Sequence, residues 1–233
     1  MNKKYEMTSI AIEWQGRKLY RIKALKSFSD VKVGDLGGYI ENESNLSQTG
    51  NAWVYDEAKV YGEAWICDNA QICDTSMVFG NARVFRDAKV YGNAWIFGNA
   101  RIYDNAKVHD SADVFDDARI YDTADVFGDV IVCDNVRVHD NARVFGNAII
   151  RDNTNVYGYA EIGGNAEVHD DADYICVKGL GSAFRDTTFF KCKNDDIGVV
   201  CGCFHGNLEK FAKKVKRTHG DNKYAKEYLA MIE

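Results

Sequence analysis

Residues 82–99, ARVFRDAKVYGNAWIFGN, contain three successive copies of the unit Ala-x-Val/Ile-x-Asp/Gly-x. The unit repeats without an insertion from Ala52 to Ala172, and a Val or Ile stands at every sixth position from Val54 to Val168, which makes twenty units. A small residue, most often Ala, precedes each Val or Ile by two positions. Self-similarity at so short a fixed period is typical of a solenoid, and a hexapeptide period indicates a parallel β-helix.

Each unit has a physical interpretation. In a strand, residues two apart share a face, so Ala52 and Val54 point inward while Trp53 and Tyr55 point outward. The next two positions are mostly Asp, Gly or Asn, which accept left-handed backbone or bond their own backbone and so suit a sharp corner. Three corners close a triangular coil of 18 residues. With coils stacked at roughly 4.8 Å, the twenty units predict somewhat under seven coils and a prism about 30 Å tall.

The repeats resemble the left-handed β-helix hexapeptide-repeat family, whose best-known members are acyltransferases. The left hand of the coil is implied by this resemblance alone. The lead-in Val33–Glu41, VGDLGGYIE, with Asn45-Leu46-Ser47, resembles bacterial and bacteriophage members of unknown function, some labelled putative transferases. The endings Val200–Phe204 and His219–Lys226 resemble the tails of phage and prophage members. The resemblance implies a homotrimer of phage or prophage type, and it does not imply a particular reaction.

The pattern divides the chain into residues 1–48, 49–173 and 174–233. The first segment predicts an N-terminal β cap, because strand-like alternation on both sides of Gln15-Gly16 indicates a hairpin that covers the first coil. The second is the β-helix. The third predicts a small α+β module with strands at 174–177, 188–191 and 199–201, a helix that begins after Asn207 and reaches about Arg217 before Gly220, and a second helix.

Composition agrees with a soluble cytoplasmic protein, and the resemblance to phage and prophage members implies a bacterial host cell. The sequence has no apolar run long enough to span a membrane, and its N-terminus lacks the apolar core of a signal peptide. Seven cysteines form no plausible disulfide framework and are expected to be free thiols. The net charge of −6 conceals an asymmetry, since the repeats hold roughly twice as many acidic as basic residues while both flanking segments are mildly basic.

Sorting the outward residues by the 18-residue coil places an apolar set on one face. A patch of this size usually marks an interface, and we expect it to form the homotrimer contact. The alternative is that outward aromatic side chains stack along a column and only stiffen the prism. The predicted interface residues are Met77, Phe79, Trp95, Phe97, Phe115, Ile131 and Ile149, with Cys133 beside them.

A second face carries Arg83, Arg101, Arg119 and Arg137 in one register, beside a column that contains Tyr121 and His139 among other rings. Guanidinium groups stacked at the strand spacing beside aromatic rings are suited to phosphates or bases. The alternative is that the corner residues Asp104, Asp122 and Asp140 neutralise these arginines as surface ion pairs. Long nucleic acid is not expected as a partner, because the acidic corners would repel its backbone.

The sequence predicts no catalytic residue, no metal site and no cofactor. His109, His139 and His169 are 30 residues apart and therefore fall on three different faces of one subunit, so they do not converge as a zinc site requires. No loop leaves the coils to wall an acyltransferase site. The Cys201-x-Cys203-x-His205 pattern lacks a second cysteine pair, and strand alternation would place its three side chains on one side as core or pocket wall.

The C-terminal module has a concentration of glycines, hydroxyls and basic groups that suits an anion. We expect Arg185 to dominate such a site. The hypothesis is a non-catalytic trimeric binding or scaffold protein that sequesters a small anionic ligand such as a nucleotide signal. The alternatives are an acyl-CoA-dependent acyltransferase and a purely structural spacer. The predicted ligand-binding residues are Ser182, Arg185, Thr187, Thr188, His205 and His219, together with Arg119 and Arg137.

Overall fold

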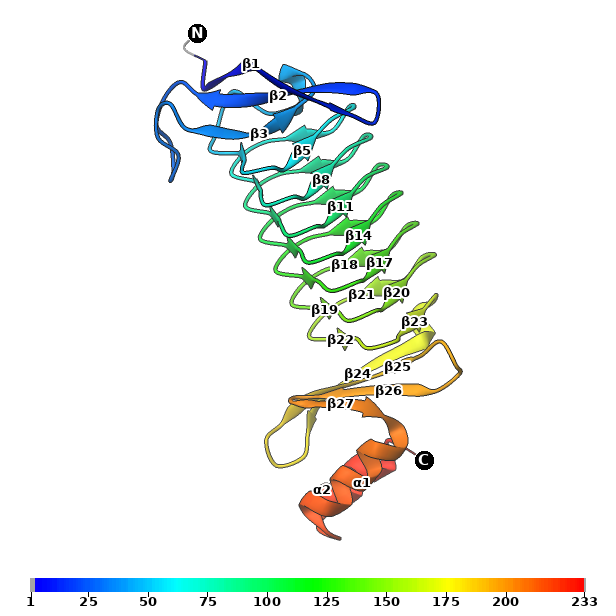
Figure 1. The fold of residues 1–233 in the computed structure, drawn as a ribbon. Helices are drawn as coiled ribbons and strands as arrows, with labels where there is room; N and C mark the ends of the chain where they lie inside the picture. Colours follow the sequence, from blue (N-terminus) through cyan, green and yellow to red (C-terminus); the bar gives the residue numbers. More distant parts are fainter. Residues whose placement is uncertain (1–2, 233) are drawn as a thin grey trace.

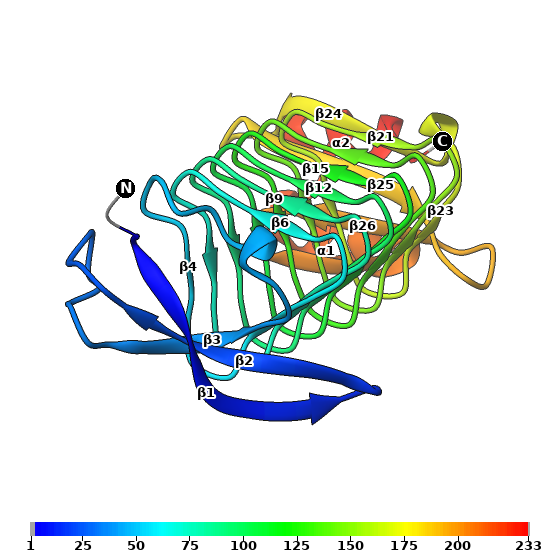
Figure 2. The same cartoon turned by 90° about the horizontal axis from the view of Figure 1, so that it is seen from above.

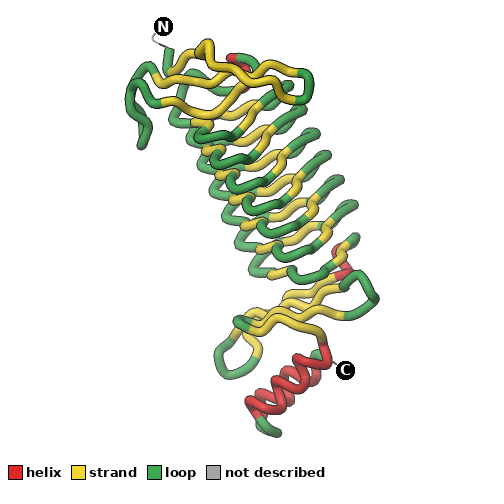
Figure 3. Tube along the Cα trace, viewed as in Figure 1, coloured by secondary structure: helices red, strands yellow, loops and turns green. Residues whose placement is uncertain are grey.

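The computed structural model describes residues 3–232 and confirms a β-solenoid of about seven turns built from parallel sheets. Figure 1 shows the coils stacked between an N-terminal group of strands and a C-terminal sheet followed by two helices. Each strand of the coil is two residues long, and loops form most of every turn (Figure 3). Each strand pairs with the strand 18 residues later, as Trp95 does with Asp113, so the register matches the sequence period.

Three sheets form the three faces of the prism (Figure 2). Face one contains β5 (Lys59–Val60), β8 (Met77–Val78), β11 (Trp95–Ile96), β14 (Asp113–Val114), β17 (Ile131–Val132), β20 (Ile149–Ile150) and β23 (Glu167–Val168). Face two contains β6 (Trp65–Ile66), β9 (Arg83–Val84), β12 (Arg101–Ile102), β15 (Arg119–Ile120), β18 (Arg137–Val138) and β21 (Asn155–Val156). Face three contains β4 (Trp53–Val54), β7 (Gln71–Ile72), β10 (Lys89–Val90), β13 (Lys107–Val108), β16 (Asp125–Val126), β19 (Arg143–Val144) and β22 (Glu161–Ile162).

The interior and the corners follow the predicted pattern. The small residue and the Val or Ile of each unit are buried and form one continuous core. The fifth residue of the unit adopts positive φ at every corner from Asp56 to Gly164, which explains why Asp and Gly prevail there. A corner Asp also accepts a hydrogen bond from the backbone one coil later, as Asp74 does from the amide of Gly92 at 2.8 Å. Corner acidity therefore has a structural cause.

The N-terminal cap closes the first coil. Strands β1 (Tyr5–Trp14) and β2 (Arg17–Ala24) form the predicted hairpin through Gln15-Gly16, and β3 (Leu36–Ile40) joins them to face one. Gly37 and Gly38 cross the coil end so closely that an added Cβ would lie 2.5 Å from a carbonyl oxygen in each case. A short 3-10 helix η1 (Glu43–Asn45) follows, and the Asn45 amide donates to two carbonyls of the first coil.

Lys4 is a buried charge within this cap. Its Nζ donates to the Ala52 carbonyl at 2.9 Å and lies 5.3 Å from the centroid of the Phe28 ring. Burial, with the nearby charge of Lys26, lowers the pKa of Lys4 to about 8. The ammonium group therefore satisfies carbonyls at the open end of the solenoid, where no further strand can pair with them.

The C-terminal module covers the last coil. After η2 (Asp171–Asp173), strands β24 (Tyr174–Leu180), β25 (Arg185–Lys191), β26 (Ile197–Cys201) and β27 (Phe204–Asn207) form an antiparallel sheet. Helix α1 (Leu208–His219) begins at the predicted N-cap Asn207 and ends at Gly220, and α2 (Lys223–Ala230) follows. Phe190 and Val200 pack into the solenoid core, so the sheet seals it. No helix among residues 3–232 is long and apolar enough to cross a membrane.

One expectation for the module is wrong. A turn at Gly202-Cys203 separates β26 from β27, and it leaves Cys201 buried while Cys203 and His205 are exposed. The three side chains therefore do not share one side of a strand.

Candidate ligand-binding surfaces

Each face of the solenoid presents two outward columns. We call the residue before the buried Val or Ile the first column and the residue after it the second column. Second-column rings stack on all three faces, with nearly parallel planes: Phe79 lies 5.0 Å from Phe97 on face one, and Tyr103 lies 5.0 Å from Tyr121 on face two. On face three, His109 stacks 4.5 Å from Tyr91. Aromatic stacking is therefore common to the whole prism, and the first column distinguishes the faces.

Face one gathers the predicted apolar set as expected. Phe97 and Phe115 stack at 4.7 Å, and Trp95 is 40% exposed in the neighbouring column. Met77 and Cys133 are buried already within one subunit, whereas Phe79, Phe97, Phe115, Ile131 and Ile149 are half-buried. The central coils of the face are mainly apolar, with Asp113 among the apolar residues, and the face becomes polar at Arg151 and Glu167 near its C-terminal end. Burial raises the pKa of Asp113, which matches its apolar surroundings.

Face two carries the arginine ladder, which we define as Arg83, Arg101, Arg119 and Arg137. Consecutive members are paired in register on adjacent strands. Among the described residues, no carboxylate oxygen lies within 4.0 Å of a ladder guanidinium nitrogen, and none of the four side chains donates a hydrogen bond. Four like charges therefore stand unneutralised at the strand spacing of roughly 4.8 Å.

The expected ion pairs with the corner aspartates do not form, for a local reason. Asp104 pairs with Arg86, which is a corner residue outside the ladder. Asp122 accepts from the backbone amide of Asp140 at 3.2 Å, and Asp140 accepts from that of Gly158 at 3.0 Å. These bonds hold the carboxylates at the corner, where Asp122 and Asp140 also lie 4.0 and 3.5 Å from Nδ1 of His139.

A cavity of about 340 Å³ lies at the C-terminal end of face two. Tyr157, which is 52% exposed, continues the aromatic column from His139 at a centroid distance of 5.8 Å. Tyr159 is equally exposed and lies under the Lys178 ammonium at 5.1 Å. We call this the tyrosine cavity; its lining residues are Asp140, Tyr157, Gly158, Tyr159, Asp171, Tyr174, Ile175, Cys176 and Lys178.

Face three differs because the charges at its C-terminal end are paired, although Lys89 and Lys107 lie opposite each other on adjacent strands nearer its N-terminal end. Arg143 lies 3.1 Å from Glu161 and 3.9 Å from Asp125. His109 places Nε2 3.1 Å from Asp125 and Nδ1 3.2 Å from Asp110, so both ring nitrogens face carboxylates. A histidine engaged in this way has no free nitrogen for a substrate proton in this arrangement.

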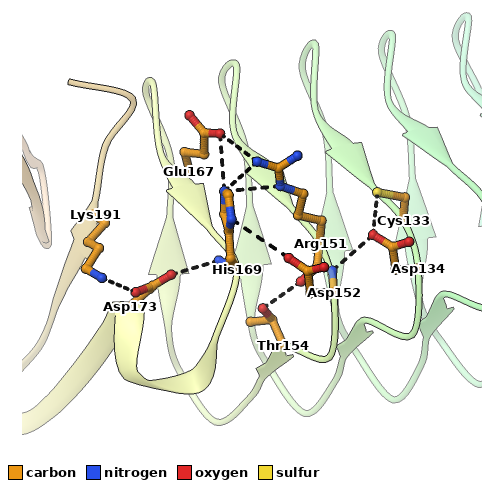
Figure 4. A network of polar contacts seen from close by, with 9 residues as sticks. All are labelled: Cys133, Asp134, Arg151, Asp152, Thr154, Glu167, His169, Asp173 and Lys191. Atoms are coloured by element: carbon orange, nitrogen blue, oxygen red, sulfur yellow. Dashed lines mark hydrogen bonds and ion pairs between the residues drawn. The ribbon is translucent and has the colours of Figure 1, made fainter. Parts of the chain in front are cut away.

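His139 and His169 occupy the other two faces, as the spacing predicts. His139 lies 3.0 Å from the Asn155 amide oxygen and is sandwiched between Tyr121 and Tyr157. His169 belongs to a polar network at the end of face one (Figure 4), where its Nε2 lies 3.1 Å from the Nε of Arg151 and 3.2 Å from Glu167. Within one subunit the three imidazoles do not converge.

The same network ties the solenoid to the module. The His169 backbone amide donates to Asp173 at 2.9 Å, and Asp173 also pairs with Lys191 of β25 (Figure 4). The pKa of Asp173 is lowered because hydrogen bonds from Lys191 and the His169 amide outweigh its desolvation. The interactions of Asp173 therefore have a structural role, because they join the last coil to β25.

Two clusters of side chains have potential metal-ligand atoms close together. Potential ligand atoms of Asp122, His139 and Asp140 lie within 4.8 Å of one another, as do those of Asp116, Cys133 and Asp134. In the first cluster, the carboxylates of Asp122 and Asp140 already accept hydrogen bonds from backbone amides at the corner. In the second, desolvation and the adjacent Asp134 raise the pKa of Cys133 to about 12, which favours the thiol over the thiolate that binds metal.

The predicted C-terminal cluster is not gathered into one place. Thr187 and Thr188 are buried, and Thr188 accepts from the Glu161 amide at 3.0 Å, so neither hydroxyl faces solvent. Ser182 and Arg185 are exposed near the β24–β25 turn, away from the buried threonines. His219 lies beside Tyr228 at 5.8 Å, while His205 lies beside Phe145 at 5.3 Å. Burial of the two threonines removes them from a surface ligand site.

The sequence reasoning missed a basic groove between β27 and α1. Lys213, Lys214 and Arg217 line it with Cys203, Phe204 and His205. The sequence does contain a signal for a basic helix face, because the i, i+3, i+4, i+7 spacing is followed by Lys210, Lys213, Lys214 and Arg217.

The fold and the repeat define a parallel β-solenoid of hexapeptide type. No family model matches the chain. A stretch of 39 residues is 46% identical to an uncharacterized acetyltransferase, YdcK, of Escherichia coli (strain K12). That stretch covers 17% of this chain and 12% of the relative, so the chain spans a small fraction of the curated relative it matches. The description agrees with the resemblance to hexapeptide-repeat proteins labelled putative transferases.

Proposed function

We propose that this chain is the subunit of a homotrimeric, non-catalytic binding scaffold of phage or prophage type, which sequesters a small anionic ligand in the cytoplasm of a bacterial host. The observation that carries the proposal is the arginine ladder, whose four guanidinium groups have no carboxylate within 4.0 Å among residues 3–232. Burying or crowding like charges costs free energy that a bound anion recovers. Two adjacent rungs, roughly 4.8 Å apart, both reach an anion placed between them.

The position of the tyrosine cavity favours a ligand that combines an anion with a ring. Arg137 is the last rung, and its register partner Asn155 precedes Tyr157 by two residues on the same face. A phosphate on Arg119 and Arg137 would leave an attached ring near the exposed faces of Tyr157 and Tyr159, and aromatic rings stack on bases. A nucleotide has this combination of groups.

Face one supports the trimer. Its stacked rings and the exposed Trp95 form an apolar surface, and such surfaces are commonly covered by another subunit. Assembly through face one leaves the arginine ladder on a different face of each subunit, so the scaffold would offer three equivalent ligand sites.

Calorimetry with mono-, di- and cyclic nucleotides tests the ligand. We expect Arg119→Ala and Arg137→Ala to lose ten- to hundredfold in affinity, because charge-assisted hydrogen bonds contribute about 1.5–3 kcal/mol each. Arg83→Ala is the matched control, since Arg83 is on the same ladder but three coils from Arg137. An equal loss in Arg83→Ala would indicate an elongated polyanion, and a dominant loss in Arg185→Ala would move the site to the module. No binding to any anion would favour the structural spacer.

Acyl transfer from acetyl-CoA is the second candidate, favoured by the match to the E. coli acetyltransferase. An acyltransferase needs a general base, and the three histidines of the solenoid supply the candidates. We expect His109→Ala, His139→Ala and His169→Ala to leave any acetyl-CoA turnover at background. Robust turnover that disappears in one of these variants would establish the enzyme instead of the scaffold.

A further inference from the structure

The groove between the β26–β27 turn and helix α1 is a strongly cationic cavity. It encloses about 400 Å³ at the end of the molecule opposite the N-terminal cap (Figure 1). Lys213, Lys214 and Arg217 form one side, and Cys203, Phe204 and His205 form the other. Half of the lining residues carry a full positive charge, and no carboxylate is among them.

The cations are presented by the fold of α1. Phe211 and Val215 are buried against the sheet, which turns Lys210, Lys213, Lys214 and Arg217 toward solvent. Over seven residues the basic face extends about 10 Å along the helix. Lys213 pairs with Glu209 one turn earlier, but no carboxylate of the described residues lies within 4.0 Å of the charged nitrogens of Lys214 or Arg217. At least two cations therefore remain available.

The opposite wall carries one partly exposed ring. The Phe204 ring is held by Phe211 at a centroid distance of 5.2 Å and remains partly exposed. His205 faces the other side of the sheet: it pairs with Val200, which packs in the solenoid core, and its ring lies beside Phe145 of face three. Phe204 is therefore the ring that faces α1. A cationic groove that tracks phosphates, combined with an exposed ring on which a base stacks, is the arrangement that binds single-stranded nucleic acid. An acidic peptide would complement the positive charge of the groove, but it would have no base to stack on the ring.

The distribution of charge limits the length of the bound strand. Residues 174–233 hold eleven Lys and Arg against seven Asp and Glu, while the repeats are strongly acidic. A polyanion is attracted to this end and repelled along the prism. We infer that the groove binds a short segment of single-stranded nucleic acid, with phosphates on Lys213, Lys214 and Arg217 and a base on Phe204. This site is separate from the arginine ladder.

Fluorescence anisotropy with a labelled twelve-nucleotide oligo-dT, at 50 and 200 mM salt, tests the inference. We expect the triple variant Lys213→Ala, Lys214→Ala, Arg217→Ala to bind at least tenfold more weakly and to lose about two units of the log–log salt slope. The matched control removes three exposed lysines outside the groove, as Lys216→Ala, Lys223→Ala, Lys226→Ala, and should keep most of the affinity. Circular dichroism should show the same Tm for both.

A second variant separates stacking from charge. Phe204→Leu should weaken binding about tenfold with an unchanged salt slope, because it removes the ring and no phosphate contact. His205→Ala is the control, since this ring faces the solenoid, and it should bind as the wild type does. Arg119→Ala with Arg137→Ala should leave oligo-dT binding intact, so this test can fail independently of the ladder. The inference is overturned if wild type does not bind at 50 mM salt, if both triple variants lose equal affinity, or if poly-glutamate of equal charge competes as well as unlabelled oligo-dT.

Discussion

Faces one and two are built from the same repeat, yet they expose opposite chemistry. Both have a buried Ala and Val or Ile inside and a stacked aromatic column outside, from Tyr61 to Phe115 on one and from Phe85 to Tyr157 on the other. They differ at the first column, which contains Met77, Trp95, Ile131 and Ile149 on face one and four arginines on face two. The aromatic column is thus part of the scaffold, and the residue two positions earlier gives each face its character.

The largest expected effect comes from one charge placed in the aromatic column of each face. Phe97→Asp should convert the proposed trimer to monomers at micromolar concentration, because it introduces a desolvated carboxylate at the centre of the apolar surface. Tyr103→Asp makes the same kind of change at a stacked ring of face two and should leave the mass unchanged. Light scattering measures both. A monomeric wild type, or dispersal by Tyr103→Asp alone, would reject face one as the interface.

The two faces could be read from the sequence because no insertion breaks the period. With strands pairing exactly one coil apart, outward residues such as Phe97 and Arg119 fall into columns by arithmetic, and the core follows from the Ala and Val positions. The ion pairs of the arginines were predicted less well than the columns. Sequence proximity suggested that Asp122 would neutralise an arginine, but its carboxylate accepts from a backbone amide one coil away.

The C-terminal module could be predicted only in part. Its strands and the cap at Asn207 have local signals, and the structure confirms them. The burial of Thr188 depends on how β25 meets the last coil, which is a tertiary contact with no fixed period. The basic groove depends likewise on the docking of α1 against β27. Buried Lys4 at the other end has the same explanation, since its partners are about fifty residues away in the sequence.

Removing a ring from either column should cost similar stability if the columns are scaffold. Phe97→Ala and Tyr121→Ala each remove a ring stacked on both sides, and such pairs contribute about 0.5–1.5 kcal/mol each beyond area burial. Urea unfolding at a protein concentration that keeps the oligomeric state constant compares them. A cost confined to Phe97→Ala would show that only the face-one column stabilises the fold.

Alkaline pH should destabilise both faces alike through their buried thiols. Burial raises the pKa of Cys67 on face two and of Cys133 on face one from 9 to about 12. The unfolded chain then releases these protons at lower pH than the folded chain. The stabilisation is complete below pH 9 and is lost as pH rises from 9 toward 12. Thermal melts from pH 8.5 to 10 should show a falling Tm, and the slope should be shallower in Cys67→Ala and in Cys133→Ala. A slope unaffected by either substitution would assign the alkaline loss to other groups.

The smallest expected effect is specific to face two. Arg119 stands between Arg101 and Arg137, and like charges directly opposite on adjacent strands destabilise by a few tenths of a kcal/mol. Arg119→Gln keeps most of the side chain and removes two repulsions, so the Tm should rise by about 1–2 °C at low salt. The gain should vanish in 1 M NaCl, where the screening length is about 3 Å.

Arg143→Gln on face three is the matched control for this substitution, because it breaks contacts with Glu161 and Asp125 and should lower the Tm or leave it unchanged. An anion that occupies the ladder should raise the Tm of the wild type more than that of Arg119→Gln, because it neutralises the repulsion that the substitution has already relieved. If Arg119→Gln instead lowers the Tm as Arg143→Gln does, the ladder guanidinium has a stabilising partner within the protein. The arginines of face two would then already be neutralised within the protein, and a bound anion would gain no free energy by relieving their repulsion.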